Sequence, residues 1–386
     1  MLQPERELTR AERLDWLRLI RTENVGPITF RMLIGRFGSA AAALDALPEL
    51  ARRGGRSRPL KPPSRAVAER ELAAHEAARV RLIALAEPAY PKQLAALEDA
   101  PPLLAVGGNP HLLERQAVGV VGARNASLNG RRLATRLARE LAQAGLVVVS
   151  GLARGIDAAA HGGALEGGTV AAIAGGLDVV YPPENAELWE EVRARGALVG
   201  ESPPGTQPTA RHFPRRNRLI AGLSLGVVVV EAALRSGSLI TARLATEAGR
   251  EVFAVPGSPL DPRAQGCNRL IRDGATLVET AADVIEGLEA MARKPVEDWT
   301  ARAFAPAGGA GAGFDFGSGP ASEGATARAL DLARRAVVEN LSPTPTAVDE
   351  LIRDCQLSPT LVLTVLLELE LAGRIERQPG NRVSLI

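Results

Sequence analysis

The sequence predicts an α/β fold in which a Rossmann-like parallel sheet forms the core, with a helical N-terminal domain and a C-terminal winged helix. Three observations support this prediction. Short apolar runs alternate with amphipathic helical segments through the middle of the chain, a segment rich in Gly, Ala and Pro follows them, and three helical patterns and a hairpin pattern end the chain. The length of 386 residues is enough for two or three domains.

The composition limits the possible partners. The formal net charge is only +2, so any anion site is a local patch. Lysine occurs only at Lys61, Lys92 and Lys294, so the positive charge is almost all arginine, which binds phosphate bidentately and stacks on bases. The isolated Cys267 and Cys355 favour a reducing compartment and argue against a cysteine metal site. With no signal-peptide pattern and no membrane-span run, we expect a cytoplasmic protein without a membrane partner.

Residues 1–65 are predicted to form a helical domain followed by a linker. Helices are expected around residues 14–20, at 28–37 and at 40–47, with a turn at Asn24–Pro27. Helix, glycine turn and helix resemble a helix-hairpin-helix or SAM-like module, which can contact DNA backbone. Because the turn holds one glycine and no basic residue, a packing role is favoured. The basic segment 52–65 is interpreted as a linker that adds nonspecific phosphate contacts.

Residues 66–290 are predicted to form the Rossmann-like domain. The apolar runs 118–122 and 146–150 flank a segment in which Leu133, Leu137 and Leu141 recur at helical spacing. Two buried strands joined by such a helix form a parallel βαβ unit. The alternation continues in strands expected at 80–84, 101–106, 169–174, 197–202, 227–231, 252–255 and 275–278, and in helices expected at 66–79, 184–195, 217–223, 239–248, 268–272 and 281–288.

The C-terminal part is predicted to be a linker and a winged helix. Residues 291–325 are rich in Gly, Ala and Pro and cannot build a core. In 326–386, helices at 326–341, 346–354 and 358–372 precede a hairpin at 374–385. The last helix is apolar, contains Glu368 and Glu370 and has no arginine, which is wrong for reading DNA. We therefore interpret this domain as a protein-contact or regulatory module.

Two predicted strands end in small-residue turns that each carry an arginine, Arg124 after Gly122 and Arg154 after Gly151. Ligands of open parallel sheets bind beyond the carboxyl ends of the strands. Two further segments are expected at the same edge. In the first, 210–224, Phe213 stands just before a helix among four arginines, Arg211, Arg215, Arg216 and Arg218. This pattern suits binding of a single-stranded nucleic acid, unless Phe213 is a core anchor. The second, Arg235–Ser238, suits binding of a phosphate, or else Ser238 caps the following helix.

No cofactor and no metal site are predicted. The first strand turn offers Gly119 and Gly122 but no GxGxxG, and no GxxxxGK[ST] occurs, which argues against NAD and P-loop chemistry. Asp157 is assigned to helix capping and Glu231 to orienting an arginine. His161 has no second His or Cys nearby and is interpreted as a packed or capping residue.

These motifs together resemble the bacterial DNA-processing protein A family (DprA, also called Smf). The resemblance is carried by Gly122–Arg124, Ser150–Asp157, Phe213–Ser224, Arg235–Ala242 and Val255–Gly257, and it covers roughly 82–286 and the final winged helix. It implies a protein without catalytic turnover that binds single-stranded DNA in natural transformation, protects incoming strands, works beside the single-strand binding protein and loads the RecA recombinase.

The resemblance also implies site residues. The DNA pocket would contain Arg124, Arg154, Phe213, Arg215, Arg216 and Arg218, lined by Gly151, Ser236, Gly237 and Ser238. Family members dimerise through the last helix and strand of the sheet domain. This region maps to 268–277, where Leu270, Ile271 and Leu277 are the apolar candidates for the homodimer interface, with the RecA contact close by.

Two alternative functions, each from another class of protein, are weighed against this one. A phosphoribohydrolase-like, nucleotide-processing enzyme would use a similar sheet, but the PGGxGTxxE motif of those enzymes is missing and Arg235–Leu239 stands in its place. A winged-helix regulator of duplex DNA is disfavoured by the acidic last helix.

Overall fold

The computed structural model of the chain describes residues 6–292, 323–378 and 380–386. They fall into two compact units. One contains Leu8–Glu69 and the winged helix, and the other begins at Arg70 and holds the large sheet. The predicted linker at 291–325 lies largely outside the described residues.

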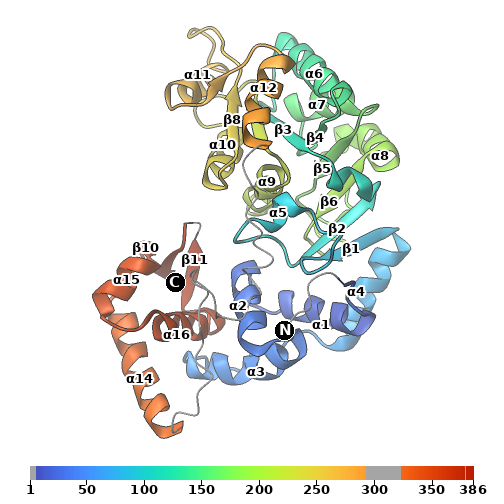
Figure 1. Ribbon diagram of the computed structural model, residues 1–386. Coiled ribbons are helices and arrows are strands. Elements are labelled where there is room, and N and C mark those ends of the chain that lie inside the picture. Colours follow the sequence, from blue (N-terminus) through green and yellow to red (C-terminus); the bar gives the residue numbers. More distant parts are fainter. Residues whose placement is uncertain (1–5, 293–322, 379) are drawn as a thin grey trace. The chain divides into compact units, whose positions relative to one another are not determined.

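The large sheet is mixed, with its strands in the order β1-β2-β6-β5-β4-β3-β7-β8-β9 (Figure 1). From β6 to β9 all neighbours are parallel, whereas β1 and β2 are antiparallel additions at one edge. The strands are β1 Val80–Ala84, β2 Leu103–Gly108, β3 Ala117–Val121, β4 Val147–Ser150, β5 Thr169–Ala172, β6 Ala197–Gly200, β7 Gly226–Val229, β8 Glu251–Ala254 and β9 Thr276–Leu277.

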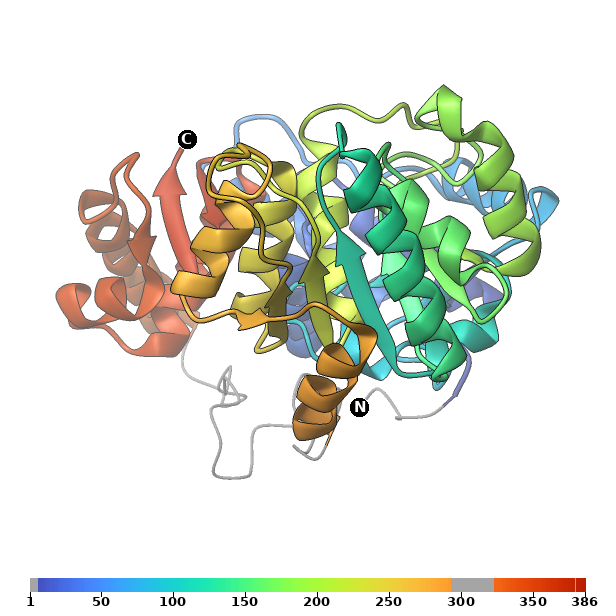
Figure 2. The same cartoon turned by 90° about the horizontal axis from the view of Figure 1, so that it is seen from above.

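The helices of this unit lie on both faces of the sheet. They are α5 Lys92–Ala95, α6 Leu128–Gln143, α7 Ile156–Ala164, α8 Ala186–Arg195, α9 His212–Leu223, α10 Gly237–Glu247, α11 Gln265–Arg272 and α12 Ala281–Ala292, with the 3-10 turns η1 Pro110–Glu114 and η2 Pro183–Asn185. Helix α4, Arg65–Ala77, spans the boundary at Arg70 between the two units. Helices α6 and α7 pack side by side, as Figures 1 and 2 both show.

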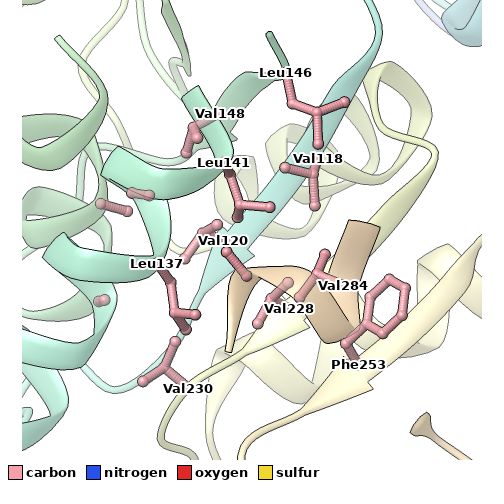
Figure 3. Close-up of a cluster of buried hydrophobic side chains, with 14 of the residues drawn as sticks. Val118, Val120, Leu137, Leu141, Leu146, Val148, Val228, Val230, Phe253 and Val284 are labelled. Carbon is pink, nitrogen blue, oxygen red and sulfur yellow. The ribbon is translucent and has the colours of Figure 1, made fainter. Parts of the chain in front are cut away.

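The core beneath α6 explains why the βαβ unit forms. Val118 and Val120 of β3 pack with Leu137 and Leu141 of α6, and all four are buried (Figure 3). Because side chains alternate along a strand, Gly119 faces the other side. A Cβ atom on Gly119 would lie 3.2 Å from Ile220, so α9 covers that opposite face at close range. The predicted α/β fold class is confirmed.

The other unit combines the N-terminal helices with the winged helix. Its helices are α1 Arg10–Ile20, α2 Pro27–Phe37, α3 Ala40–Arg53, α14 Glu323–Glu339, α15 Val348–Cys355 and α16 Pro359–Leu371. The strands β10 Thr346–Ala347, β11 Ile375–Gln378 and β12 Arg382–Leu385 form a small antiparallel sheet. Helix α3 continues past Pro48, beyond the predicted end at residue 47.

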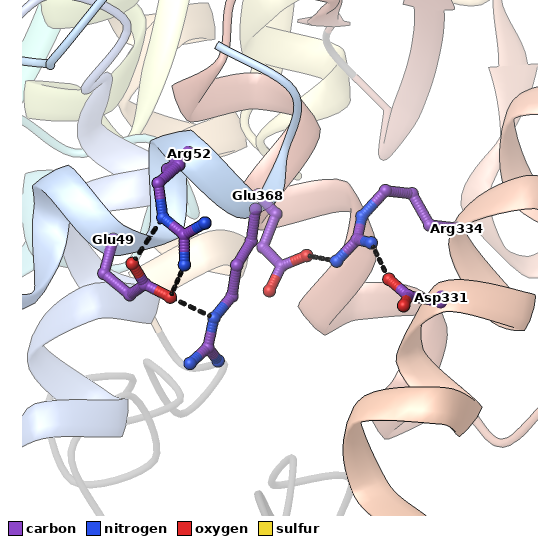
Figure 4. Close-up of polar contacts among 6 residues, drawn as sticks. Glu49, Arg52, Asp331, Arg334 and Glu368 are labelled. Atoms are coloured by element: carbon purple, nitrogen blue, oxygen red, sulfur yellow. Dashed lines mark hydrogen bonds and ion pairs between the residues drawn. The ribbon is translucent and has the colours of Figure 1, made fainter. Parts of the chain in front are cut away.

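Helix α16 is buried on every side from Val362 to Leu369. One side packs into the winged-helix core and another packs against α3. Glu368 is fully buried, and its Oε2 accepts a hydrogen bond of 2.6 Å from Arg334 (Figure 4). A helix covered in this way has no free face for a DNA groove. The interpretation of the domain as a protein-contact or regulatory module stays a prediction.

The close approach of α3 and α16 depends on Gly54. A Cβ atom there would lie 1.9 Å from the carbonyl oxygen of Glu368. Gly54→Ala therefore forces the two backbones apart, and we expect a loss of about 1–3 kcal/mol in the free energy of unfolding of this unit, measured by hydrogen exchange along α16. The control is Gly35→Ala within α2, where a Cβ meets open space. Equal exchange in the two variants would contradict the role of Gly54.

Candidate nucleic-acid interface

A pocket of about 200 Å³ opens where neighbouring parallel strands end. The turns after β3 and β4 and the loop after β5 meet there because these strands are adjacent in the sheet. Helix α9 supplies the remaining wall. The residues of this strand-end pocket are Arg124, Gly151, Ala153, Arg154, Tyr181, Pro182, Pro183, Glu184, Phe213 and Arg216.

Two aromatic rings and a guanidinium lie together in the strand-end pocket. The rings of Tyr181 and Phe213 are 5.8 Å apart and inclined at 48°. The Arg124 guanidinium carbon lies 5.0 Å from the Phe213 ring centroid, which is cation–π distance. Tyr181 is 41% exposed, so its ring is accessible to a planar ligand.

Arg216 lies beneath the pocket and determines what the β4 turn can contain. Its Nη1 donates to the carbonyl oxygen of Ala172 at 3.0 Å, while its Nε is buried without a hydrogen-bond partner. A Cβ atom at Gly151 would lie 1.7 Å from Nη1, so a larger residue there would displace the buried Arg216 guanidinium. Burial lowers the pKa of Arg216, which the carboxylate of Asp157 opposes. An arginine stays charged even so, and it contributes a fixed positive charge.

Asp157 stabilises the β4 turn from below. Its Oδ2 accepts hydrogen bonds from the backbone N–H groups of Gly151 at 3.1 Å and Ala153 at 3.4 Å. Burial raises the pKa of Asp157, and the nearby Arg216 acts in the opposite direction. The carboxylate therefore orders the turn, whereas the N-cap of α7 is Gly155 and not Asp157 as predicted.

The N-terminal end of α6 is occupied by a carboxylate of this chain. Glu231 follows β7, and its oxygens accept from the backbone N–H of Ser127 at 2.8 Å and from the Ser127 hydroxyl at 2.5 Å. Its hydrogen bonds go to Ser127 and not to an arginine. Its predicted effect on an arginine is limited to its charge, since the pKa of Arg263 is raised by the hydrogen-bonded Asp261 and, to a smaller extent, by Glu231. In dinucleotide-binding sheets this helix end takes the pyrophosphate. In this chain the Glu231 carboxylate occupies the place of that pyrophosphate.

Several predicted site residues lie outside the strand-end pocket. Arg215 is exposed on the first turn of α9, because that helix begins at His212 and not at residue 217 as predicted. Ser236, Gly237 and Ser238 begin α10, where Ser236 is the N-cap in place of the predicted Ser238 and the two hydroxyls lie 2.7 Å apart.

Arg218 is not among the residues that line the strand-end pocket. Its guanidinium bonds the carboxylate of Glu201 and, at 2.7 Å, the backbone oxygen of Asp99. Burial lowers the pKa of Arg218, but the charges of Glu201 and Asp99 outweigh it and raise the pKa. A guanidinium already neutralised and only 8% exposed is a poor phosphate ligand, so the structure speaks against the predicted DNA contact.

Sequence reasoning missed Tyr181, Pro182, Pro183, Glu184 and Ala153. The signal for Tyr181 was its scarcity, because the chain has two tyrosines and this one follows a buried strand. The strand before it, β5, neighbours β4, so the following loop opens at the same edge of the sheet.

The predicted dimer candidates lie at one end of the sheet. Leu277 belongs to β9, the edge strand, and is 47% exposed. Leu270 and Ile271 are half-buried on α11. Within the described residues no helix is long and apolar enough to cross a bilayer, and no group of three His, Cys, Asp or Glu side chains is placed to hold a metal ion.

His161 is a packed residue, as predicted, and its hydrogen bonds define its tautomer. Its Nε2 accepts from the backbone N–H of Leu152 at 3.3 Å, so the proton resides on Nδ1. Nδ1 lies 2.7 Å from the hydroxyl of Thr169, which in turn donates to the carbonyl oxygen of Val148. Burial, with help from the charge of Arg216, lowers the pKa of His161 to about 3.

This lowered pKa predicts a pH-dependent stability. Below the ordinary His pKa of about 6.5 the unfolded chain binds a proton that folded His161 refuses, so the free energy of unfolding falls by up to about 1.4 kcal/mol per pH unit toward the folded pKa of about 3. Urea unfolding from about pH 7.5 to about pH 4.5 should show a shallower loss for His161→Gln. His111→Gln, at an exposed position, is the control, and identical slopes in both variants would refute the assignment.

The described residues thus form a sheet with a basic, aromatic pocket at its strand ends, a small helical domain and a winged helix. Residues 81–289 match the family described as DNA recombination-mediator protein A. Residues 10–74 match the DprA-like N-terminal HHH domain, and 321–381 match the DprA winged helix domain. The chain therefore belongs to the DNA recombination-mediator protein A family, and the predicted resemblance is confirmed.

Individual relatives agree with this assignment. The DNA processing protein DprA of Bacillus subtilis is 43% identical over 222 residues, 57% of this chain and 75% of the relative. The crystal structure of DprA from Streptococcus pneumoniae is 37% identical, with a TM-score of 0.60 over 73% of this chain and 98% of that one. A Helicobacter pylori DprA structure, described for its single-stranded DNA binding mode, is 31% identical, with a TM-score of 0.51 over 55% of this chain and 96% of that one.

Proposed function

We propose that this protein binds single-stranded DNA in the strand-end pocket, without catalytic turnover. The observation that carries the proposal is the exposed Tyr181 beside Phe213, with Arg124 over the Phe213 ring. Unstacked bases stack on aromatic rings while arginines neutralise the backbone, which is how proteins hold single strands. A duplex offers no free base face to these rings.

The distribution of charge supports a strand rather than a mononucleotide. Arg124, Arg154 and the exposed Arg215 lie along the turns and the first turn of α9, while Glu231 fills the helix end that a nucleotide phosphate would use. The solved relative from Helicobacter pylori is described as binding single-stranded DNA. Two free cysteines suit a cytoplasmic place of action.

Within this proposal the protein protects incoming strands in transformation and homologous recombination, acts beside the single-strand binding protein, and loads RecA as a homodimer. The family assignment supports the recombination role. The exposed β9 edge with Leu277 supports the dimer, because an unpaired edge strand can pair with that of a second copy. The half-buried Leu270 and Ile271 would extend this interface.

Binding to a fluorescent oligo-dT and to a matched duplex tests the proposed function. We expect tighter binding of the single strand, and a loss of about 5- to 100-fold for Phe213→Ala from lost stacking. Arg124→Ala should weaken binding and lower the slope of log K against log salt by about 0.7. Arg243→Ala, which removes an exposed arginine of α10 outside the strand-end pocket, is the control. Equal affinity for duplex and single strand would refute the proposal.

The dimer is tested separately by sedimentation. Leu277→Glu places a charge on the β9 edge, and we expect the dimer dissociation constant to rise at least about 10-fold, since a buried charge without a partner costs several kcal/mol. Leu128→Glu, at another exposed leucine, should leave the oligomeric state unchanged. If Leu277→Glu sediments as the wild type does, the β9 edge is not the interface.

A further inference from the structure

The strand-end pocket contains one carboxylate among its guanidinium groups. Glu184, in the turn η2, lies with Oε1 3.4 Å from Nη1 of Arg154. The two side chains are 58% and 55% exposed. The Arg154 guanidinium is therefore already paired with a carboxylate of this chain when no DNA is bound.

The backbone that carries Glu184 is held in place by the residues around it. The side-chain amide of Asn185 donates to the carbonyl oxygen of Leu152 at 2.9 Å, which ties η2 to the turn after β4. Leu152 is fully buried, and Pro182 and Pro183 restrict the backbone before Glu184. The loop thus presents the carboxylate to Arg154 at the edge of the pocket.

We propose that Glu184 acts through Arg154 as a built-in competitor of phosphate and thereby favours single strands over duplex. This inference rests on the proposed function of the pocket. A phosphate that binds Nη1 of Arg154 has to displace Glu184, and the carboxylate stays close enough to repel the backbone. An exposed ion pair is weak enough to be displaced. When a base of a single strand stacks on Tyr181 and Phe213, the stacking energy helps the strand to displace Glu184 from Arg154. A duplex binds through its phosphates alone and gains no stacking energy.

Glu184→Gln is the direct test, because it keeps the size of the side chain and removes its charge. We expect the variant to bind oligo-dT about two- to fivefold more tightly, the range that an exposed ion pair accounts for, and to gain more for the matched duplex. The slope of log K against log salt should steepen by about 0.7 for the single strand, since Arg154 then neutralises a phosphate. A merely structural role of Glu184 would not change this slope.

Two further variants test whether Glu184 acts through Arg154. In an Arg154→Ala background, Glu184→Gln should bring almost no gain, because the competitor has lost its target. Glu187→Gln on α8 removes the same charge nearby without touching the strand-end pocket, and it should leave affinity and selectivity unchanged.

The outcomes separate this inference from the proposed function. If wild type prefers single strands but Glu184→Gln binds no more tightly, or gains as much without Arg154, the inference is wrong and the proposed function stands. If Glu184→Gln binds more weakly, Glu184 contacts the strand directly, which also overturns the inference. If wild type shows no preference for single strands, both are overturned.

Discussion

The strand-end pocket depends on one buried contact, the Arg216 guanidinium lying against the backbone of Gly151. Arg216 donates to Ala172 at the end of β5 and lies beneath the turn after β4, so it connects two neighbouring strand ends through a side chain of α9. Asp157 supplies the opposing charge and orders the same turn. With the floor fixed in this way, the exposed Arg154 and the two aromatic rings are placed on a rigid base.

The site is displaced from the usual ligand position of such sheets. The chain order reverses between β3 and β7, and a dinucleotide normally binds in the crevice at that point. Here Glu231 and Ser127 close it, and a Cβ atom on Gly122 would already lie 2.6 Å from Ile156. The pocket instead lies at the carboxyl ends of β3, β4 and β5, three central strands of the sheet.

Much of the fold follows from local patterns because the parallel strands are buried on both faces and appear as continuous apolar runs. The start of α9 does not follow in this way. Pro214 and the polar residues around it resemble a loop, yet a proline is tolerated in the first turn, where its missing N–H has no partner to lose. The pairing of Arg218 with Asp99 and Glu201 joins segments far apart in the chain, so no local pattern could have predicted it. Tyr181 was missed for the same reason, since only the sheet order brings its loop beside Phe213.

The positive charge of the strand-end pocket comes from arginine side chains and not from backbone N–H groups, and this difference suits a flexible strand. At the start of α6 and in the turn before α7, backbone N–H groups that often hold phosphates already have partners in Ser127, Glu231 and Asp157. In the proposed function, arginine side chains therefore bind the phosphates, and of these Arg216 is buried and Arg154 is exposed. A compact phosphate group favours convergent backbone donors. Exposed guanidinium groups beside aromatic rings instead match a backbone and bases whose spacing varies from one nucleotide to the next.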